Sequence, residues 1–226
     1  MLVQIPNVLT AAEVVALRTR IDATRWVDGN VTSGHQSAQA KSNEQIPEDS
    51  PVARECGETI LKALSRSPLF VSSALPARVF PPLFNRYREG MTFANHVDSA
   101  LRTHGPSGMR IRTDLSATLF LADPEQYDGG ELVIDDNFGM HSVKLQAGAL
   151  AVYPSSSLHR VNAVTRGTRV ASFFWIQSLV RDDARRTVLF DLDMAVIRLT
   201  QRDAQAPELV SLTAVYHNLL RMWSEP

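Results

Sequence analysis

Between Ala77 and Gln177 the chain breaks into eight short β-prone segments separated by turn residues. Segments of this length and spacing are typical of a β-sandwich or jelly roll whose neighbouring strands run antiparallel. Glycine-rich stretches separate them, and "TRGTR" predicts a tight turn between the last two strands. The predicted strands cover residues 78–88, 92–98, 112–122, 130–136, 141–145, 148–154, 158–164 and 169–177.

Helical patterns flank this β-rich region on both sides. Thr10 and Glu13 have the spacing of a capping box ahead of an apolar series of helical period. Ser50 and Pro51 open a second predicted helix, and two more are predicted after Trp175, capped by Asp182 or Asp183 and starting after Ala206. We therefore expect an N-terminal helical support over 1–76, a mostly β core over 77–178 and a C-terminal helical pair over 179–226.

Residues 28–50 are rich in Gly, Ser, Asn and Gln and show no periodicity. We expect a long surface loop there. Loops of this length are uncommon and often functional, so a lid over a site is one interpretation and an inert insertion is the other.

Composition limits the classes of partner. The chain has 226 residues, 44% of them hydrophobic, and a formal net charge of −1, which offers no overall attraction to nucleic acid or to an anionic membrane. Its one cysteine, Cys56, excludes an intramolecular disulfide and suits a reducing compartment. The N-terminus lacks the pattern of a secretory leader, so we expect a cytoplasmic location.

The stretch "NHVDSA" places His96 and Asp98 two residues apart in a predicted strand. Side chains at i and i+2 project from one face of a strand, so both can reach one point inside the roll. His159 begins a later predicted strand near the mouth of the same roll, and Arg169 begins the strand "RVASFFW". An arginine inside an apolar strand needs an anionic partner, because burying an unpaired charge is costly.

Two histidines and a carboxylate on one face match the facial triad of non-haem Fe(II) oxygenases, which leaves metal positions open. A 2-oxo acid and O2 can occupy these positions, while the guanidinium fork of Arg169 pairs with the far carboxylate of 2-oxoglutarate. Each residue type then has a chemical role: the two histidines and the carboxylate bind the metal, and the arginine binds 2-oxoglutarate.

The same residues carry a family resemblance. The segments "FNRYREGMTFANHVDSA", "RTDLSATLFLADPEQYDGGELVI" and "YPSSSLHRVNAVTRGTRVASFFWIQS" resemble the bacterial PKHD-type hydroxylases, which belong with the prolyl 4-hydroxylase-like Fe(II)/2-oxoglutarate dioxygenases. The resemblance implies a double-stranded β-helix (jelly roll), an Fe(II) site at His96, Asp98 and His159, and 2-oxoglutarate on Arg169. It also implies that Tyr87 approaches 2-oxoglutarate, that Trp175 walls the pocket, and that L-ascorbate serves as reductant. Some relatives are associated with siderophore uptake.

Other interpretations of the pattern remain open. His96 and Asp98 could be an ordinary hydrogen-bonded pair. The roll could be an iron- or 2-oxoglutarate-binding sensory module without turnover, or a zinc hydrolase, which gives Arg169 no role. An amino acid such as proline or lysine, a peptide or a siderophore-related molecule would fit equally well as the substrate that is hydroxylated, and the apolar helical tail makes a homodimer plausible.

Overall fold

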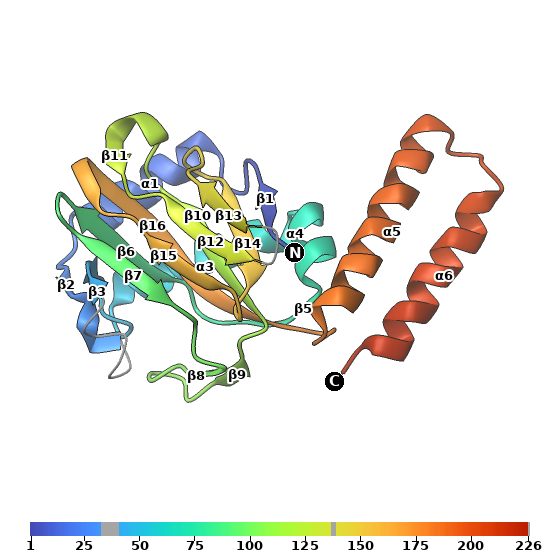
Figure 1. Cartoon of the computed structure of the whole chain (residues 1–226), viewed down its shortest axis with the longest axis horizontal. Coiled ribbons are helices and arrows are strands. Elements are labelled where there is room, and N and C mark those ends of the chain that lie inside the picture. Colours follow the sequence, from blue (N-terminus) through green and yellow to red (C-terminus); the bar gives the residue numbers. More distant parts are fainter. Residues whose placement is uncertain (33–40, 137–138, 226) are drawn as a thin grey trace.

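The structure is a computed structural model that describes residues 1–32, 41–136 and 139–225. It is a two-sheet β roll with helices packed on one side and a helical pair at its end (Figure 1). All strand pairs are antiparallel, as predicted. The mostly β fold with flanking helices and a C-terminal helical pair is thereby confirmed.

The larger sheet has the strand order β1-β14-β10-β16-β6-β4-β2, and β11 and β5 pair with β16 outside that path. Its strands are β1 (Val3–Ile5), β2 (Val27–Asp28), β4 (Glu44–Gln45), β5 (Pro76–Val79), β6 (Leu83–Arg88), β10 (Leu115–Phe120), β11 (Tyr127–Gly129), β14 (Leu150–Pro154) and β16 (Val164–Ser178).

The smaller sheet has the order β13-β12-β15-β7-β3, and β8 and β9 form a separate hairpin. The strands concerned are β3 (Lys41–Ser42), β7 (Thr92–His96), β8 (Leu101–Thr103), β9 (Arg110–Arg112), β12 (Leu132–Asp136), β13 (Gly139–Val143) and β15 (Leu158–Val161).

The helices form two groups. α1 (Ala11–Asp22), α3 (Pro51–Ser65) and α4 (Pro68–Ala74) precede the roll, and α5 (Asp183–Arg202) and α6 (Glu208–Trp223) follow it. Short 3-10 helices lie at η1 (Gly29–Thr32) and η2 (Pro124–Gln126). No helix in the described part of the chain combines the length and apolarity needed to cross a membrane.

Local sequence signals explain the starts of α1, α3 and α5. The predicted capping box of Thr10 and Glu13 is present at α1, and the side chain of Asp182 caps α5. Ser50 stands at the N-cap of α3, yet its side chain makes no capping hydrogen bond there. Pro51 at the first turn sets the start of that helix instead, since its fixed φ suits a helix start and it has no N–H to satisfy.

Two apolar layers lie on the two faces of the larger sheet. The largest apolar cluster joins α1 and α3 to one face of the sheet, through residues such as Ile21, Ile60 and Phe174. A second cluster, with Phe120 and Tyr153 from the larger sheet and Ile134 from the smaller one, fills the space between the sheets. Both faces of the central strand β10 are therefore covered, and all six of its residues are buried.

The predicted turn at "TRGTR" is wrong. β16 runs without interruption from Val164 to Ser178, and the chain reverses before it, after β15. Gly167 instead adopts a positive φ of 76° where Tyr127 of β11 lies opposite it, and a Cβ there would meet the Gln126 carbonyl oxygen at 2.2 Å. The glycine thus permits close strand pairing rather than a hairpin.

The predicted loop over 28–50 is wrong in part. β3 and β4 lie within it and add short edge strands to the two sheets, pairing with β7 and β6. Residues 33–40 lie outside the described part, so the lid interpretation stays a prediction.

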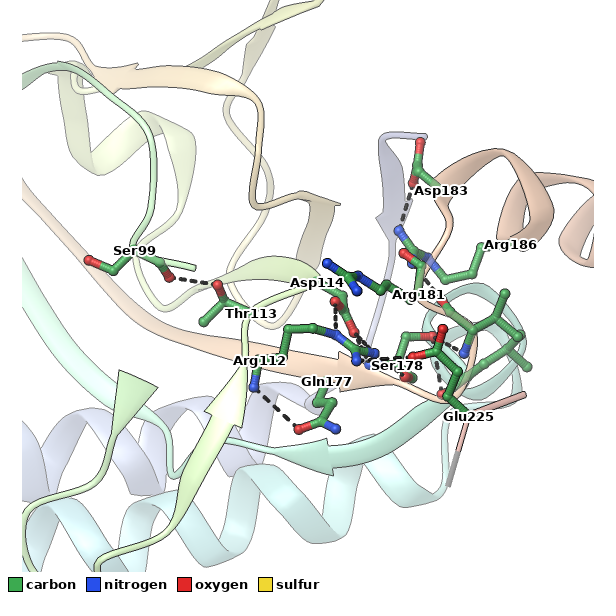
Figure 2. Close-up of polar contacts among 12 residues, drawn as sticks. Ser99, Arg112, Thr113, Asp114, Gln177, Ser178, Arg181, Asp183, Arg186 and Glu225 are labelled. Carbon is green, nitrogen blue, oxygen red and sulfur yellow. Dashed lines mark hydrogen bonds and ion pairs between the residues drawn. The ribbon is translucent and has the colours of Figure 1, made fainter. Parts of the chain in front are cut away.

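A polar network fastens the C-terminal pair to the roll (Figure 2). Nε and Nη2 of Arg112 donate to the two carboxylate oxygens of Asp114 at 2.7 and 3.0 Å, and Nη1 donates to Glu225 beyond the end of α6 at 3.1 Å. Asp114 also accepts a hydrogen bond from the backbone N–H of Ser178 at 2.9 Å. One arginine thereby connects the end of β9, the end of β16 and the chain terminus.

Replacing Arg112 by alanine is expected to lower the free energy of unfolding by about 3 kcal/mol, because the carboxylate of Asp114 stays buried without its cation. The side chain of Asp114 is only 5% exposed. Arg166→Ala is the matched control, since Arg166 makes a similar two-pronged contact with Asp128 in which both side chains are 58% exposed. Urea unfolding followed by circular dichroism measures both. Equal stability of the two variants would contradict a supporting role for the Arg112 network.

Candidate active site

Three candidate metal ligands converge between the two sheets. His96 ends β7 and His159 lies on β15, where the two residues face each other as register partners. Asp98 follows two residues after His96 and lies beyond the end of the strand, so the expected strand over 92–98 is too long. One ligand atom from each of the three side chains lies within 4.8 Å of the others.

Backbone carbonyls orient both imidazoles. Nδ1 of His96 lies 2.8 Å from the carbonyl oxygen of Ala94, and Nδ1 of His159 lies 3.0 Å from that of Ser157. A proton on each Nδ1 satisfies these contacts and leaves each Nε2 as a lone-pair donor. Metal-binding histidines are commonly fixed in this way.

Neighbouring side chains hold the carboxylate of Asp98 and the ring of His96 in place. Ser116 of β10 donates a hydrogen bond to Oδ2 of Asp98 at 2.5 Å. The hydroxyl of Thr113 donates to the Ser99 carbonyl oxygen at 2.6 Å, which holds the loop behind Asp98 (Figure 2). The ring of Phe93 stacks on His96 at a centroid distance of 3.5 Å.

Burial, together with the nearby His159, lowers the pKa of His96 to about 4. The neutral form that a metal requires is therefore favoured above that value. In the metal-free protein, His96 takes up a proton near pH 6.5 in the unfolded chain but only near pH 4 in the folded chain. The free energy of unfolding therefore falls as the pH drops from about 6.5 to about 4.

We expect the metal-free protein to lose on the order of 2 kcal/mol of stability between about pH 7 and about pH 4.5 through His96. His96→Gln removes this contribution. Urea titrations of both proteins at the two pH values measure it. Parallel pH dependence in wild type and variant would mean that His96 titrates normally in the folded state.

Arg169 lies on the larger sheet, in the wall of the same cavity as the three ligands. It is 1% exposed, and its guanidinium lies 5.3 Å from the ring centre of Tyr87 and 5.4 Å from that of Phe120. Nε and Nη1 are buried without a hydrogen-bond partner among the described residues. A buried guanidinium with unsatisfied donors fits a carboxylate, the chemistry that 2-oxoglutarate presents.

The other two predicted site residues also line this cavity. Tyr87 is the register partner of Arg169 and is 1% exposed, and burial raises the pKa of its hydroxyl. Trp175 lies six residues further along β16 on the same face and is 7% exposed. The structure thus brings all six predicted site residues into one cavity.

Several polar residues of the cavity were missed by sequence reasoning. Asn43 and Asn85 are buried and line it, each with a side-chain atom that has no hydrogen-bond partner among the described residues. Lys41 and Arg102 also line it. Ser116 and Thr118 carried a readable signal, because they alternate with apolar residues in "LSATLF". The local sequence around Lys41, Asn43, Asn85 and Arg102 carried none.

Two sequence families match the chain: the 2OG-Fe(II) oxygenase superfamily over residues 82–177 and the PKHD-type hydroxylase C-terminal domain over residues 183–225. A PKHD-type hydroxylase of Xanthomonas campestris pv. campestris is 60% identical over 227 residues, and one of Phenylobacterium zucineum is 62% identical over 226. Both alignments cover 100% of each chain. The chain belongs to the PKHD-type hydroxylases.

PKHD-type hydroxylases fall in the 2-oxoglutarate- and Fe(II)-dependent oxygenases, so the chain is an oxidoreductase of the dioxygenase class that acts on a small molecule or peptide with O2. A prolyl-4-hydroxylase crystal structure from Pseudomonas putida has the same fold, with a TM-score of 0.52 and 22% identity, covering 78% of this chain and 92% of that one. The predicted jelly roll is confirmed.

Proposed function

We propose that the chain hydroxylates a C–H bond of an amino-acid, peptide or siderophore-related substrate, with Fe(II) held by His96, Asp98 and His159 and 2-oxoglutarate held by Arg169. The observation that carries this proposal is the placement of the unsatisfied guanidinium of Arg169 in the same cavity as three ligand atoms within 4.8 Å of one another. A structural ion pair would not need three candidate metal ligands, and a purely structural metal site would not need a buried guanidinium with unsatisfied donors beside it.

When bound, Fe(II) supplies the redox chemistry by which O2 converts 2-oxoglutarate to succinate and CO2 and the substrate gains a hydroxyl group. The protein side chains orient the reactants. His96 and His159 present Nε2, Asp98 is held by Ser116, and Arg169 fixes the far carboxylate of 2-oxoglutarate.

Tyr87 and Trp175 have supporting roles in this proposal. The ring of Tyr87 lies under the guanidinium of Arg169, where it shields the carboxylate of 2-oxoglutarate from water. Trp175 forms part of the wall towards the substrate, and its ring packs edge-on against Phe80 and Phe173.

The proposal has five further parts. L-Ascorbate as reductant and a link to iron uptake rest on the family resemblance, and a cytoplasmic location is in keeping with the single buried thiol of Cys56. The proposed division has one boundary two residues after α4, at 76/77, and the other at the end of β16, at 178/179. A homodimer is supported by α6, which has no buried residue and exposes Val210 at 77% and Met222 at 73%.

Succinate release tests the proposed reaction. The iron-loaded protein is incubated with 2-oxoglutarate, O2 and ascorbate, alone and with each member of a panel of amino acids, peptides and siderophores. We expect one class of compound to stimulate succinate release and to gain one oxygen atom by mass spectrometry. Tight 2-oxoglutarate binding without any turnover, stimulated or not, would instead support a sensory module.

A further inference from the structure

Three consecutive serines form the turn between β14 and β15, where the chain passes from the larger sheet to the smaller one. They are Ser155, Ser156 and Ser157, which follow the end of β14 and precede the start of β15. Ser155 is only 3% exposed, whereas Ser156 is exposed to solvent. A buried hydroxyl group needs a hydrogen-bond partner, so the surroundings of Ser155 indicate what it does.

Two buried hydroxyl groups connect this turn to Asp98. The Oγ atoms of Ser155 and Ser116 lie 2.8 Å apart, and Oγ of Ser116 lies 2.5 Å from Oδ2 of Asp98. An ionised carboxylate only accepts hydrogen bonds, so the single hydroxyl proton of Ser116 is used on Asp98. Ser155 therefore donates its own proton to Ser116. The hydrogen bonds run in one direction, from Ser155 through Ser116 to Asp98.

The same turn holds a second candidate ligand through its backbone. The carbonyl oxygen of Ser157 lies 3.0 Å from Nδ1 of His159 and orients that imidazole. Nε2 of His159 in turn lies 3.8 Å from Oδ2 of Asp98. Asp98 follows β7 and His159 lies on β15, so the two ligands are far apart in sequence. Their contacts nevertheless meet at two residues of one turn, which can set the position of one ligand relative to the other.

The backbone of the turn is itself fixed. The N–H of Ser155 donates to the carbonyl oxygen of Asp114 at 3.1 Å, and the N–H of Ser157 donates to that of Pro154 at 3.0 Å. The carboxylate of Asp114 belongs to the Arg112 network that fastens the C-terminal pair. Because its backbone is already held, the side chain of Ser155 loses little further conformational freedom when it donates to Ser116.

We propose that Ser155 is a positioning residue for the metal site, which acts through Ser116 to hold the carboxylate of Asp98 in the orientation that meets the metal together with His159. This inference rests on the proposed function above, in which Asp98 and His159 bind Fe(II). Hydrogen bonds in a chain polarise one another, so donation by Ser155 strengthens the bond from Ser116 to the carboxylate. Partners behind a metal ligand fix its orientation and thereby raise metal affinity.

Anaerobic titration of the full-length protein with Fe(II) and with Co(II) tests this. Ser116→Ala should weaken metal binding by about ten-fold or more, the effect expected for loss of the partner that touches the ligand. Ser155→Ala should weaken it by about five-fold, because a neutral hydrogen bond one step further away is lost while Ser116 still donates to Asp98. The visible absorption of bound Co(II), which reports the geometry of its ligands, should change in both variants.

The double variant distinguishes a hydrogen-bond chain from two independent effects. If Ser155 acts through Ser116, the protein with both substitutions should bind metal no more weakly than Ser116→Ala alone. Two unrelated structural losses would instead add in free energy and weaken binding by about fifty-fold. A general loss of packing at Ser155 would not produce this dependence on Ser116.

Two other serines provide matched controls. Ser156→Ala removes an exposed hydroxyl from the same turn. Ser172→Ala removes a hydroxyl that is 0% exposed and donates to the Leu83 carbonyl oxygen outside the cavity. Both variants should bind metal like the wild-type protein, although Ser172→Ala should lower the free energy of unfolding. Circular dichroism confirms that each variant is folded.

Wild-type metal affinity in Ser155→Ala would overturn the inference, and so would additive losses in the double variant. An equal loss in Ser156→Ala would overturn it as well, since the effect would then belong to the turn and not to the buried hydroxyl. Any of these results leaves the proposed function standing if the wild-type protein binds one Fe(II) per chain and 2-oxoglutarate with it. A wild-type protein that binds no metal rejects both.

Discussion

Replacing His159 by alanine is expected to abolish stoichiometric binding of Fe(II) and to weaken metal affinity by well over about 100-fold, more than the loss of a supporting partner costs. In the proposed site His159 is one of three candidate protein ligands among the described residues, and its Nε2 lies 3.8 Å from Oδ2 of Asp98. Alanine leaves two ligands at an otherwise unchanged site. Anaerobic titration with Fe(II), or with Co(II) as a spectroscopic substitute, measures stoichiometry and affinity.

His141→Ala is the matched control for this experiment. His141 also contacts a carboxylate, with its Nε2 3.0 Å from Asp136, but the pair is exposed and lies outside the cavity. Metal binding should be unaffected by its loss. Unchanged iron stoichiometry in the His159 variant would show that the third ligand is another residue.

Replacing Arg169 by alanine should raise the dissociation constant for 2-oxoglutarate by roughly thirty-fold or more, because truncating one partner of a desolvated charge pair costs about 2 to 5 kcal/mol. Arg169→Lys retains the charge but loses the planar fork, so its effect should be smaller. Fe(II) binding should survive both changes, since the guanidinium lies on the opposite sheet from His96 and His159. Direct 2-oxoglutarate titration of the iron-loaded variants tests this.

Arg186→Ala controls for the loss of a buried arginine as such. Arg186 is also 1% exposed, but it donates to the carbonyl oxygens of Val180 and Arg181 and to Asp183, at the start of the C-terminal pair. We expect this variant to be destabilised and still to bind 2-oxoglutarate with wild-type affinity. An equal loss of affinity in both variants would mean that Arg169 acts through folding alone.

Much of the fold could be predicted because strand periodicity and helix caps are local signals. The capping box at Thr10 and the aspartate cap at Asp182 both act as predicted. The errors arose where partners distant in sequence decide the structure. Gly167 looks like a turn residue, yet its positive φ serves the pairing of β16 with β11. The two-residue strands β3 and β4 exist only through their pairing with β7 and β6.

The residues of the candidate site likewise fall into those that the local sequence indicated and those that it did not. His96 and Asp98 could be predicted from their spacing, although Asp98 lies beyond the end of β7. His159 and Arg169 could be predicted because a polar side chain that interrupts an apolar segment needs a binding partner. Lys41 and Arg102 could not be predicted, because nothing in their local sequence indicates that the edge strand β3 and the β8–β9 hairpin place them in the cavity. Ser116 gave a partial signal, but its hydrogen bond to Asp98 depends on how the two sheets face each other.

Absorption of the Fe(II)–2-oxoglutarate complex tests the central claim most directly. Chelation of 2-oxoglutarate to Fe(II) gives a metal-to-ligand charge-transfer band in the absence of O2, and the proposed site makes this band depend on both the three candidate metal ligands and Arg169. We predict a band that saturates at one 2-oxoglutarate per iron in the wild-type protein, needs far more 2-oxoglutarate in Arg169→Ala, and is missing in His159→Ala. A wild-type protein that binds iron but gives no such band, or an Arg169→Ala protein that saturates like wild type, would contradict the account.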